Sequence, residues 1–111
     1  MTAKLHGPLA SADVAATTNT AVYVVPAGRK ASCQVNLVNR SAADVTVRVA
    51  IIPGAIGTLT NAHYWDYGPT LAANGGTLNR DRIALGAGHT LMVWASATGV
   101  SAGLVGVEED V

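Results

Sequence analysis

Residues 31–51 read ASCQVNLVNRSAADVTVRVAI, and this stretch decides the fold class. Apolar residues stand at positions 31, 33, 35 and 37 and again at 45, 47, 49 and 51, with more polar residues between most of them. Because successive side chains of a β-strand point to opposite faces, this period predicts two strands that each bury one face. The short polar segment from Asn39 to Asp44 is typical of a connection between antiparallel neighbours. The stretch therefore predicts a β-hairpin with one buried face.

The same kind of pattern continues on both sides of this stretch. Segments with β-branched or aromatic residues predict further strands at 20–25, 63–67, 77–85, 90–95 and 101–107, with a weaker one at 9–14. Segments rich in Gly and Pro separate them, and residues 53–61 are expected to form an exposed loop. Seven or eight short strands without a helical stretch predict an all-β antiparallel sandwich, either immunoglobulin-like or jelly-roll-like.

The two ends of the chain lack this strong patterning. We expect residues 18–107 to form the sandwich domain and residues 1–17 to form a flexible N-terminal arm. Residues 108–111 are expected to be an acidic C-terminal tail. The arm carries Leu5 and Leu9, and we expect its segment from Thr2 to Asp13 to reach onto a neighbouring subunit.

Length and charge restrict the possible partners. The 111 residues suit a single domain, and seven Lys and Arg balance seven Asp and Glu. Without a basic excess, nucleic acid and anionic membranes are not expected partners. Only 13% of the residues are charged, and a surface with so few charges associates readily, so we expect a homo-oligomer. The first residues lack the apolar stretch of a secretory signal, which predicts a protein made in a cytosol.

Three features of the sequence are candidates for catalytic or metal-binding chemistry. Residues 99–103, GVSAG, match the G-x-S-x-G elbow of hydrolases, but that motif needs a following helix and a later histidine. A strand is expected after Ser101, and all the histidines precede it. Neither the histidines nor Asp66 show the tight spacing of a metal site, and Cys33 lies on the apolar face of its strand, as a buried thiol does. We therefore expect no catalytic residue, metal or cofactor. The histidines are His6, His63 and His89.

The most informative local feature is the aromatic segment HYWDY at residues 63–67, in a chain with only five Trp and Tyr residues. Strand alternation predicts that His63, Trp65 and Tyr67 share one face, and that Tyr64 and Asp66 share the other. One face is expected to be core, and the other is left for packing at an edge or for contact with a protein or a glycan. Trp94, close to Met92, can complete either cluster.

A second candidate contact lies in the segment RDR at residues 80–82. Alternation predicts that Arg80 and Arg82 share one face of a strand. A solvated face is the simplest interpretation. The alternative is a contact in which the two guanidinium groups bind a ligand carboxylate or the acidic tail, residues 108–110, of a neighbouring subunit.

The order of several short motifs resembles a group of small structural proteins of tailed bacteriophages. In that group a segment like AVYVVPAGRKA (21–31) leads to VNLVNRS (35–41) and then to VTVRVAI (45–51). The later segments YWDY (64–67), LAANG (71–75) and MVWAS (92–96) fit the continuation, so the likeness covers about residues 18–107.

The resemblance implies a β-sandwich protein of the virion, made in the host bacterial cytoplasm and used in head decoration, at the neck or collar, or in the tail and its fibres. The group carries no catalytic residues to transfer. It implies an accessory subunit that binds copies of itself and other virion proteins. A receptor- or glycan-binding module of the tail or fibre is the alternative.

Overall fold

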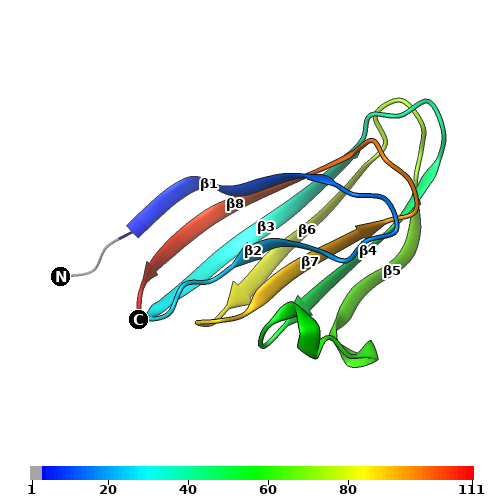
Figure 1. Cartoon of the computed structure of the whole chain (residues 1–111). Coiled ribbons are helices and arrows are strands. Elements are labelled where there is room, and N and C mark those ends of the chain that lie inside the picture. Colours follow the sequence, from blue (N-terminus) through cyan, green and yellow to red (C-terminus); the bar gives the residue numbers. More distant parts are fainter. Residues whose placement is uncertain (1–3) are drawn as a thin grey trace.

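The structure, a computed structural model, describes the backbone of residues 4–111 and the side chains of residues 7–111. It is built from eight strands and two short 3₁₀ helices (Figure 1). The strands are β1 (Lys4–Val14), β2 (Thr20–Val24), β3 (Arg29–Asn39), β4 (Val45–Ile52), β5 (Tyr64–Leu71), β6 (Thr77–Leu85), β7 (Thr90–Ala95) and β8 (Val100–Asp110). The 3₁₀ helices η1 (Ile56–Thr58) and η2 (Asn61–His63) lie between β4 and β5. No helix in the described part of the chain is long and apolar enough to cross a membrane.

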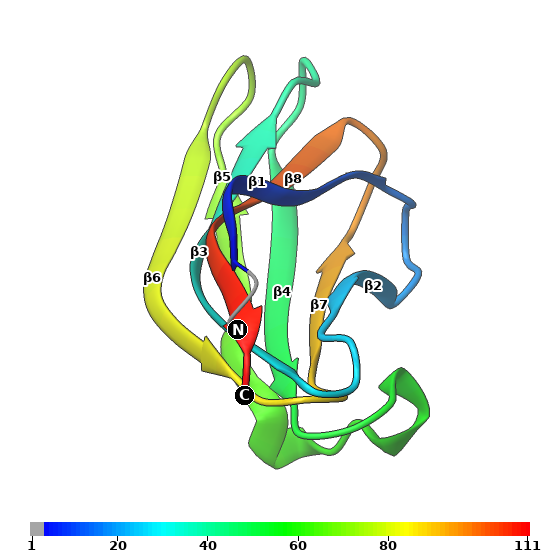
Figure 2. The same cartoon turned by 90° about the vertical axis from the view of Figure 1, so that its left-hand side faces the viewer.

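The strands form two four-stranded antiparallel sheets, which confirms the predicted sandwich (Figures 1 and 2). Sheet A has the order β1-β8-β3-β6, and sheet B has the order β2-β7-β4-β5. The first strand pairs with the last, the second with the seventh, the third with the sixth and the fourth with the fifth. This nesting of four antiparallel pairs is the topology of a double-sheet jelly roll rather than that of an immunoglobulin domain.

The hairpin predicted from residues 31–51 is wrong in one respect. Its two segments are strands, β3 and β4, but β3 pairs with β8 and β6 in sheet A, whereas β4 pairs with β7 and β5 in sheet B. Their odd-numbered apolar residues are buried, except for the half-buried Ile51, because the two strands face each other across the core. Alternation shows which face of a strand is buried, but it does not show which other strand pairs with it.

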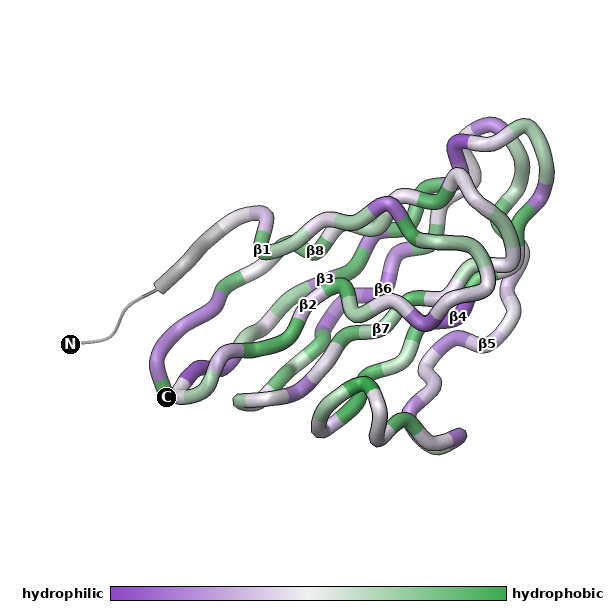
Figure 3. Tube along the Cα trace, viewed as in Figure 1, coloured by the Kyte–Doolittle hydropathy of each residue, from purple (hydrophilic) through white to green (hydrophobic). Residues whose placement is uncertain are grey.

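The core between the sheets consists mainly of small and branched aliphatic side chains, which recur along the strands of both sheets (Figure 3). Val35, Leu37, Val47, Leu91 and Leu104 are among those with no exposed surface. Neither tryptophan belongs to this cluster, and Tyr23 is its single aromatic member within the described residues. The large rings are therefore free to lie on the outside of the sandwich.

Residues 4–14 and 108–110 belong to strands of the folded domain, contrary to the predicted arm and tail, while residues 1–3 of the predicted arm lie outside the described part of the chain. Residues 4–14 form β1 and pair along nearly their whole length with β8 of the same chain, from Lys4 with Glu109 to Val14 with Val100. Leu9 packs against the main core. The sequence does not predict the full strand, because many of its side chains are small. In addition, the register shifts between Pro8 and Ala10, and this bulge interrupts the alternation of apolar and polar residues.

The acidic end of the chain is held by charges and by a buried hydrogen bond. Glu108 is 5% exposed, accepts a hydrogen bond from the hydroxyl of Tyr23 in sheet B, and lies 3.3 Å from Arg29. Arg29 also lies 3.5 Å from Asp110. Burial, followed by the hydrogen bond to Glu108, raises the pKa of Tyr23. These contacts tie β8 to β2 and β3 at the end of the sandwich where β8 finishes.

At the opposite end of β3, the buried side chain of Asn39 organises two connections. Its amide nitrogen donates to the carbonyl oxygens of Ala43 and Leu71, at 2.8 and 3.1 Å. Its amide oxygen accepts from the backbone and the hydroxyl of Ser41. The same side chain thus links Ala43 of the β3–β4 connection to Leu71 at the end of β5, and its own buried polar atoms are satisfied.

Candidate functional site

The outer face of sheet B carries a second apolar cluster that the sequence did not predict. Ala50, Ile52 and Met92 point away from the main core, yet each is fully buried. They are covered by Ile56 and Leu59 of the β4–β5 connection and by the rings of Tyr64 and Trp94. The segment 53–61, expected to be an exposed loop, is therefore partly a lid over one half of this face, at the end where β5 begins (Figures 1 and 2).

The other half of the face carries a row of three side chains from three adjacent strands. Arg48 of β4 is in register with Trp94 of β7 on one side and with Tyr67 of β5 on the other. Its guanidinium carbon lies 4.0 Å from the centroid of the Trp94 ring and 4.3 Å from that of Tyr67. We call these three residues the aromatic–arginine row. Cation–π contacts of this geometry hold the arginine in place.

Tyr64 extends the aromatic–arginine row toward the lid. Its ring lies 4.8 Å from that of Tyr67, at 84°, in an edge-to-face arrangement. The two tyrosines share a face because Trp65 is an extra residue in the ladder: Asp66 is in register with Val49, and Tyr64 with Ala50. The predicted division of residues 63–67 between two faces is therefore wrong, since a β-bulge breaks the alternation. Tyr64, Tyr67 and Asn61 line an open hollow of about 420 Å³.

His63 does not belong to this strand at all. It ends η2, and its Nδ1 accepts a hydrogen bond from the backbone N–H of Thr60 in a capping box. Trp65 and Tyr67, by contrast, are 49% and 64% exposed. The two rings offer a contact surface at the free edge of sheet B, where β5 is the outermost strand.

Arg80 and Asp66 join the two sheets along the edge formed by β6 and β5. The guanidinium of Arg80 donates two hydrogen bonds to the carboxylate of Asp66, at 2.5 and 3.1 Å. This carboxylate raises the pKa of Arg80. Arg82 does not share a face with Arg80 as predicted, because a bulge in β6 gives Arg82 a positive φ of 58° and leaves it exposed.

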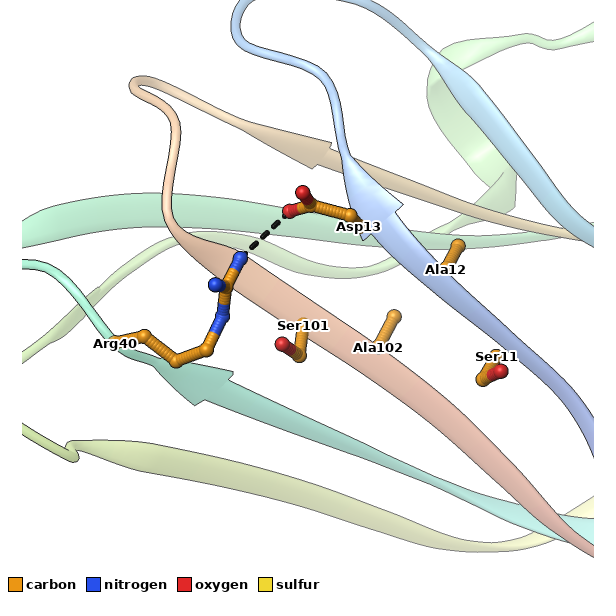
Figure 4. Close-up of a pocket in the computed structure, with 6 residues that line it drawn as sticks. All are labelled: Ser11, Ala12, Asp13, Arg40, Ser101 and Ala102. Atoms are coloured by element: carbon orange, nitrogen blue, oxygen red, sulfur yellow. Dashed lines mark hydrogen bonds and ion pairs between the residues drawn. The ribbon is translucent and has the colours of Figure 1, made fainter.

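The G-x-S-x-G segment lies elsewhere, on sheet A. Ser101 is part of β8, in accordance with the expected strand, and lies in an open hollow lined also by Ser11, Asp13 and Arg40 (Figure 4). Arg40 forms an ion pair with Asp13 at 2.7 Å, and both side chains are more than half exposed. Exposed pairs of this kind contribute little to stability.

Cys33 and His89, the remaining candidates for chemistry, are respectively buried and hydrogen-bonded to the backbone. Burial raises the pKa of the Cys33 thiol to about 11. The Nδ1 atom of His89 accepts a hydrogen bond from the backbone N–H of Gly86. Within the described residues, no three His, Cys, Asp or Glu side chains gather so that they could hold a metal ion. The side chains of Leu5 and His6 lie outside the described residues.

The structure thus brings together three of the aromatic residues named from the sequence, Tyr64, Tyr67 and Trp94, with Trp65 beside them. Arg80 reaches this strand only through Asp66, and Arg82 and Leu9 lie on strands of sheet A. Sequence reasoning missed Arg48, which occupies an ordinary polar position of an alternating strand. Its role is visible only from the pairing of β4 with β5 and β7, because its aromatic neighbours stand 19 and 46 residues further along the chain.

Comparison with known proteins adds no identification. No protein-family model matches the chain, and no curated protein matches it.

Proposed function

We propose that this chain is a non-enzymatic structural protein of a bacteriophage virion. It acts as an accessory subunit that decorates or reinforces the particle, on the capsid or at the neck or collar, through contacts with copies of itself and with other virion proteins. The observation that carries the proposal is the partly uncovered outer face of sheet B, with the aromatic–arginine row and the exposed Trp65.

The composition of this face supports a role in protein contacts. Tyr, Trp and Arg are the residue types most enriched among those that dominate binding energy at protein interfaces. Here Arg48 is held between two rings, so little side-chain freedom is lost when a partner covers it. The low overall charge of the chain also favours association.

The fold and the sequence resemblance support the assignment to a virion. Double-sheet jelly rolls recur in viral capsid domains, although the same fold also serves lectins and other proteins, so this support is an analogy. The motifs at residues 21–31, 35–41 and 45–51, which resemble those of tailed-bacteriophage structural proteins, narrow the class further.

The first test is the solution mass of the purified protein, measured by size-exclusion chromatography with light scattering and followed by negative-stain imaging. We expect a closed homo-oligomer that a Trp65→Ser/Tyr67→Ser double variant dissociates. Val24→Ser is the matched control, since Val24 is also about half exposed but lies on β2, at the opposite edge of sheet B. A wild-type monomer at all concentrations, or equal dissociation by the control, would contradict this use of the face.

A receptor- or glycan-binding module of the tail or fibre is the second candidate. The observation in its favour is the hollow lined by Asn61, Tyr64 and Tyr67, which offers aromatic rings and an amide beside the exposed Trp65. Glycan-array binding that is lost in a folded Trp65→Ala variant would favour this function over the structural one.

A further inference from the structure

Arg48 differs from most other described basic side chains in its electrostatic partners. Ion pairs hold Arg29, Lys30, Arg40 and Arg80, at distances between 2.5 and 3.7 Å. Among the side chains of residues 7–111, no carboxylate lies within ion-pair distance of Arg48, whose recorded contacts are the rings of Tyr67 and Trp94. Its positive charge is therefore fixed in position without a matching negative charge.

The neighbouring rings determine where Arg48 can bind a further group. Tyr67 and Trp94 come from the strands on either side of β4, and both rings lie against the guanidinium. The N–H donors of a guanidinium lie in its plane and form a fork that matches a carboxylate. With the guanidinium carbon placed over both rings, the N–H fork is the part of Arg48 that we expect to bind a further group.

We infer that Arg48 binds the carboxylate of an Asp or Glu side chain that a partner protein presents to the aromatic–arginine row. This inference rests on the proposed function and names the chemistry of its contact. A partner that covers the row removes water from the guanidinium, and burying a charge without a counter-charge is costly. An acidic side chain at the centre of the partner's surface removes that cost and gives a charge-assisted, two-point contact.

The surroundings of Arg48 favour an acidic protein segment over an acidic sugar. A sugar ring needs several hydrogen-bond acceptors for its hydroxyl groups. The one carboxylate of β5, Asp66, is already engaged by both hydrogen bonds from Arg80. The rings of Trp94, Tyr67 and Tyr64 make up most of the surface beside Arg48, with the single amide of Asn61 next to Tyr64, and such rings suit the apolar residues that flank an acidic side chain at a protein interface.

The experiment is an NMR titration of the isotope-labelled full chain, observed at the side-chain Nε–H of Arg48 and the indole N–H of Trp94. The probes are a capped tetrapeptide, Ala-Glu-Leu-Ala, its counterpart with Gln in place of Glu, and sodium glucuronate. We expect saturable shifts with the acidic peptide and binding about tenfold or more weaker with the neutral peptide, because a hydrogen bond to a charged group is lost. Higher salt should weaken the acidic peptide's binding.

Variants assign the binding to Arg48 itself. Arg48→Gln should abolish the difference between the two peptides, and Arg48→Lys should retain part of it, since lysine keeps the charge without the planar fork. Arg82→Gln is the matched control, because Arg82 is an exposed arginine on sheet A without a recorded ion pair. If Arg48→Gln fails to fold, the comparison of the two peptides on the wild-type chain, observed at the Nε–H of Arg48, still shows whether Arg48 prefers the carboxylate.

Equal binding of both peptides, no binding of either, or tighter binding of glucuronate than of the acidic peptide would overturn the inference. The last result would assign Arg48 to an acidic sugar. None of these results bears on the solution mass of the protein, so a failure here is distinguishable from a failure of the proposed structural role.

Discussion

Replacing Tyr23 by Phe removes one oxygen atom from the interior of the sandwich. The Tyr23 hydroxyl donates to Glu108, a carboxylate that is 5% exposed and belongs to the other sheet. The ring itself stays in place in the Phe variant, so the packing of the core is unchanged. The substitution therefore isolates the hydrogen bond between β2 and β8.

The size of the effect follows from the charge of the acceptor. A hydrogen bond to a charged group contributes about 1.5–3 kcal/mol to stability. Because Arg29 remains 3.3 Å from Glu108 and still balances part of its charge, we expect a loss of about 2 kcal/mol. A chain of this length unfolds with an entropy of about 0.23 kcal/mol/K, so the melting temperature should fall by about 9 °C.

The assay is thermal and urea unfolding at pH 7, followed by circular dichroism, with Tyr67→Phe as the control. Tyr67 is 64% exposed, and removal of its hydroxyl should change the stability by less than about 0.5 kcal/mol. A Tyr23→Phe variant as stable as the control would refute the reasoning.

The pH dependence gives a second check on the same bond. Burial raises the pKa of Tyr23 in the folded state above its ordinary value of 10.0, so the unfolded chain ionises first as the pH rises. The stability that the wild type owes to neutral Tyr23 is complete below pH 10 and is lost above it. The deficit of Tyr23→Phe should therefore shrink by about 1.4 kcal/mol at pH 11, and a deficit that stays constant would contradict this account.

Three other perturbations test the fold. Asn39→Ala should cost about 3 kcal/mol in urea unfolding, because it removes the buried amide that donates to the carbonyl oxygens of Ala43 and Leu71, whereas Asn36→Ala, at a half-buried position of the same strand, should cost less than 1 kcal/mol. Deletion of residues 1–13 should lower the melting temperature by more than about 10 °C, since it removes one of the two ladder partners of β8 and leaves only β3; an unchanged melting temperature would mean that β1 is dispensable. Alkylation of Cys33 at pH 8 should be roughly 100-fold slower in the folded than in the unfolded protein, and comparable rates would contradict its burial.

Periodicity predicted the strands well because it reports burial, which is a property of each segment by itself. The segments at 31–37 and 45–51 are strands whose odd-numbered residues are mostly buried, as expected. Their pairing could not be predicted in the same way. Two antiparallel strands of one hairpin and two strands facing each other in different sheets present the same alternation, and only the partners supplied by β6, β7, β8 and β5 decide between them.

The predictions for the two ends of the chain were wrong because neither end carries a local sequence pattern that reveals its strand. Glu108 looks like part of a solvated tail, yet it is buried because a hydroxyl 85 positions earlier and a guanidinium 79 positions earlier meet it in space. β1 looks unpatterned because its side chains are small and a bulge interrupts it. Neither effect leaves a local signal in the sequence.

The candidate site shows the same division between local and long-range information. Tyr64, Trp65 and Tyr67 were identifiable because they stand together in a chain that is poor in aromatic residues. Their arrangement depends on the bulge at Trp65, which turns Tyr64 and Tyr67 to one face. Arg48 could not be singled out, because its contacts arise from the alignment of three strands.

The lid on sheet B covers part of its outer face and sets apart the surface that we propose to bind a partner. Residues Ile56 and Leu59 remove one half of the outer face from solvent, so the chain has the means to cover apolar surface on this side. The lid does not cover the aromatic–arginine row, where a charged residue separates two rings. A guanidinium at this position keeps the uncovered half hydrated in the free subunit and raises the cost of contact with any surface that lacks a negative charge. Arg48 therefore disfavours contact with an uncharged or basic surface and favours one that presents an acidic side chain, whether that surface belongs to a second copy of the chain or to another protein.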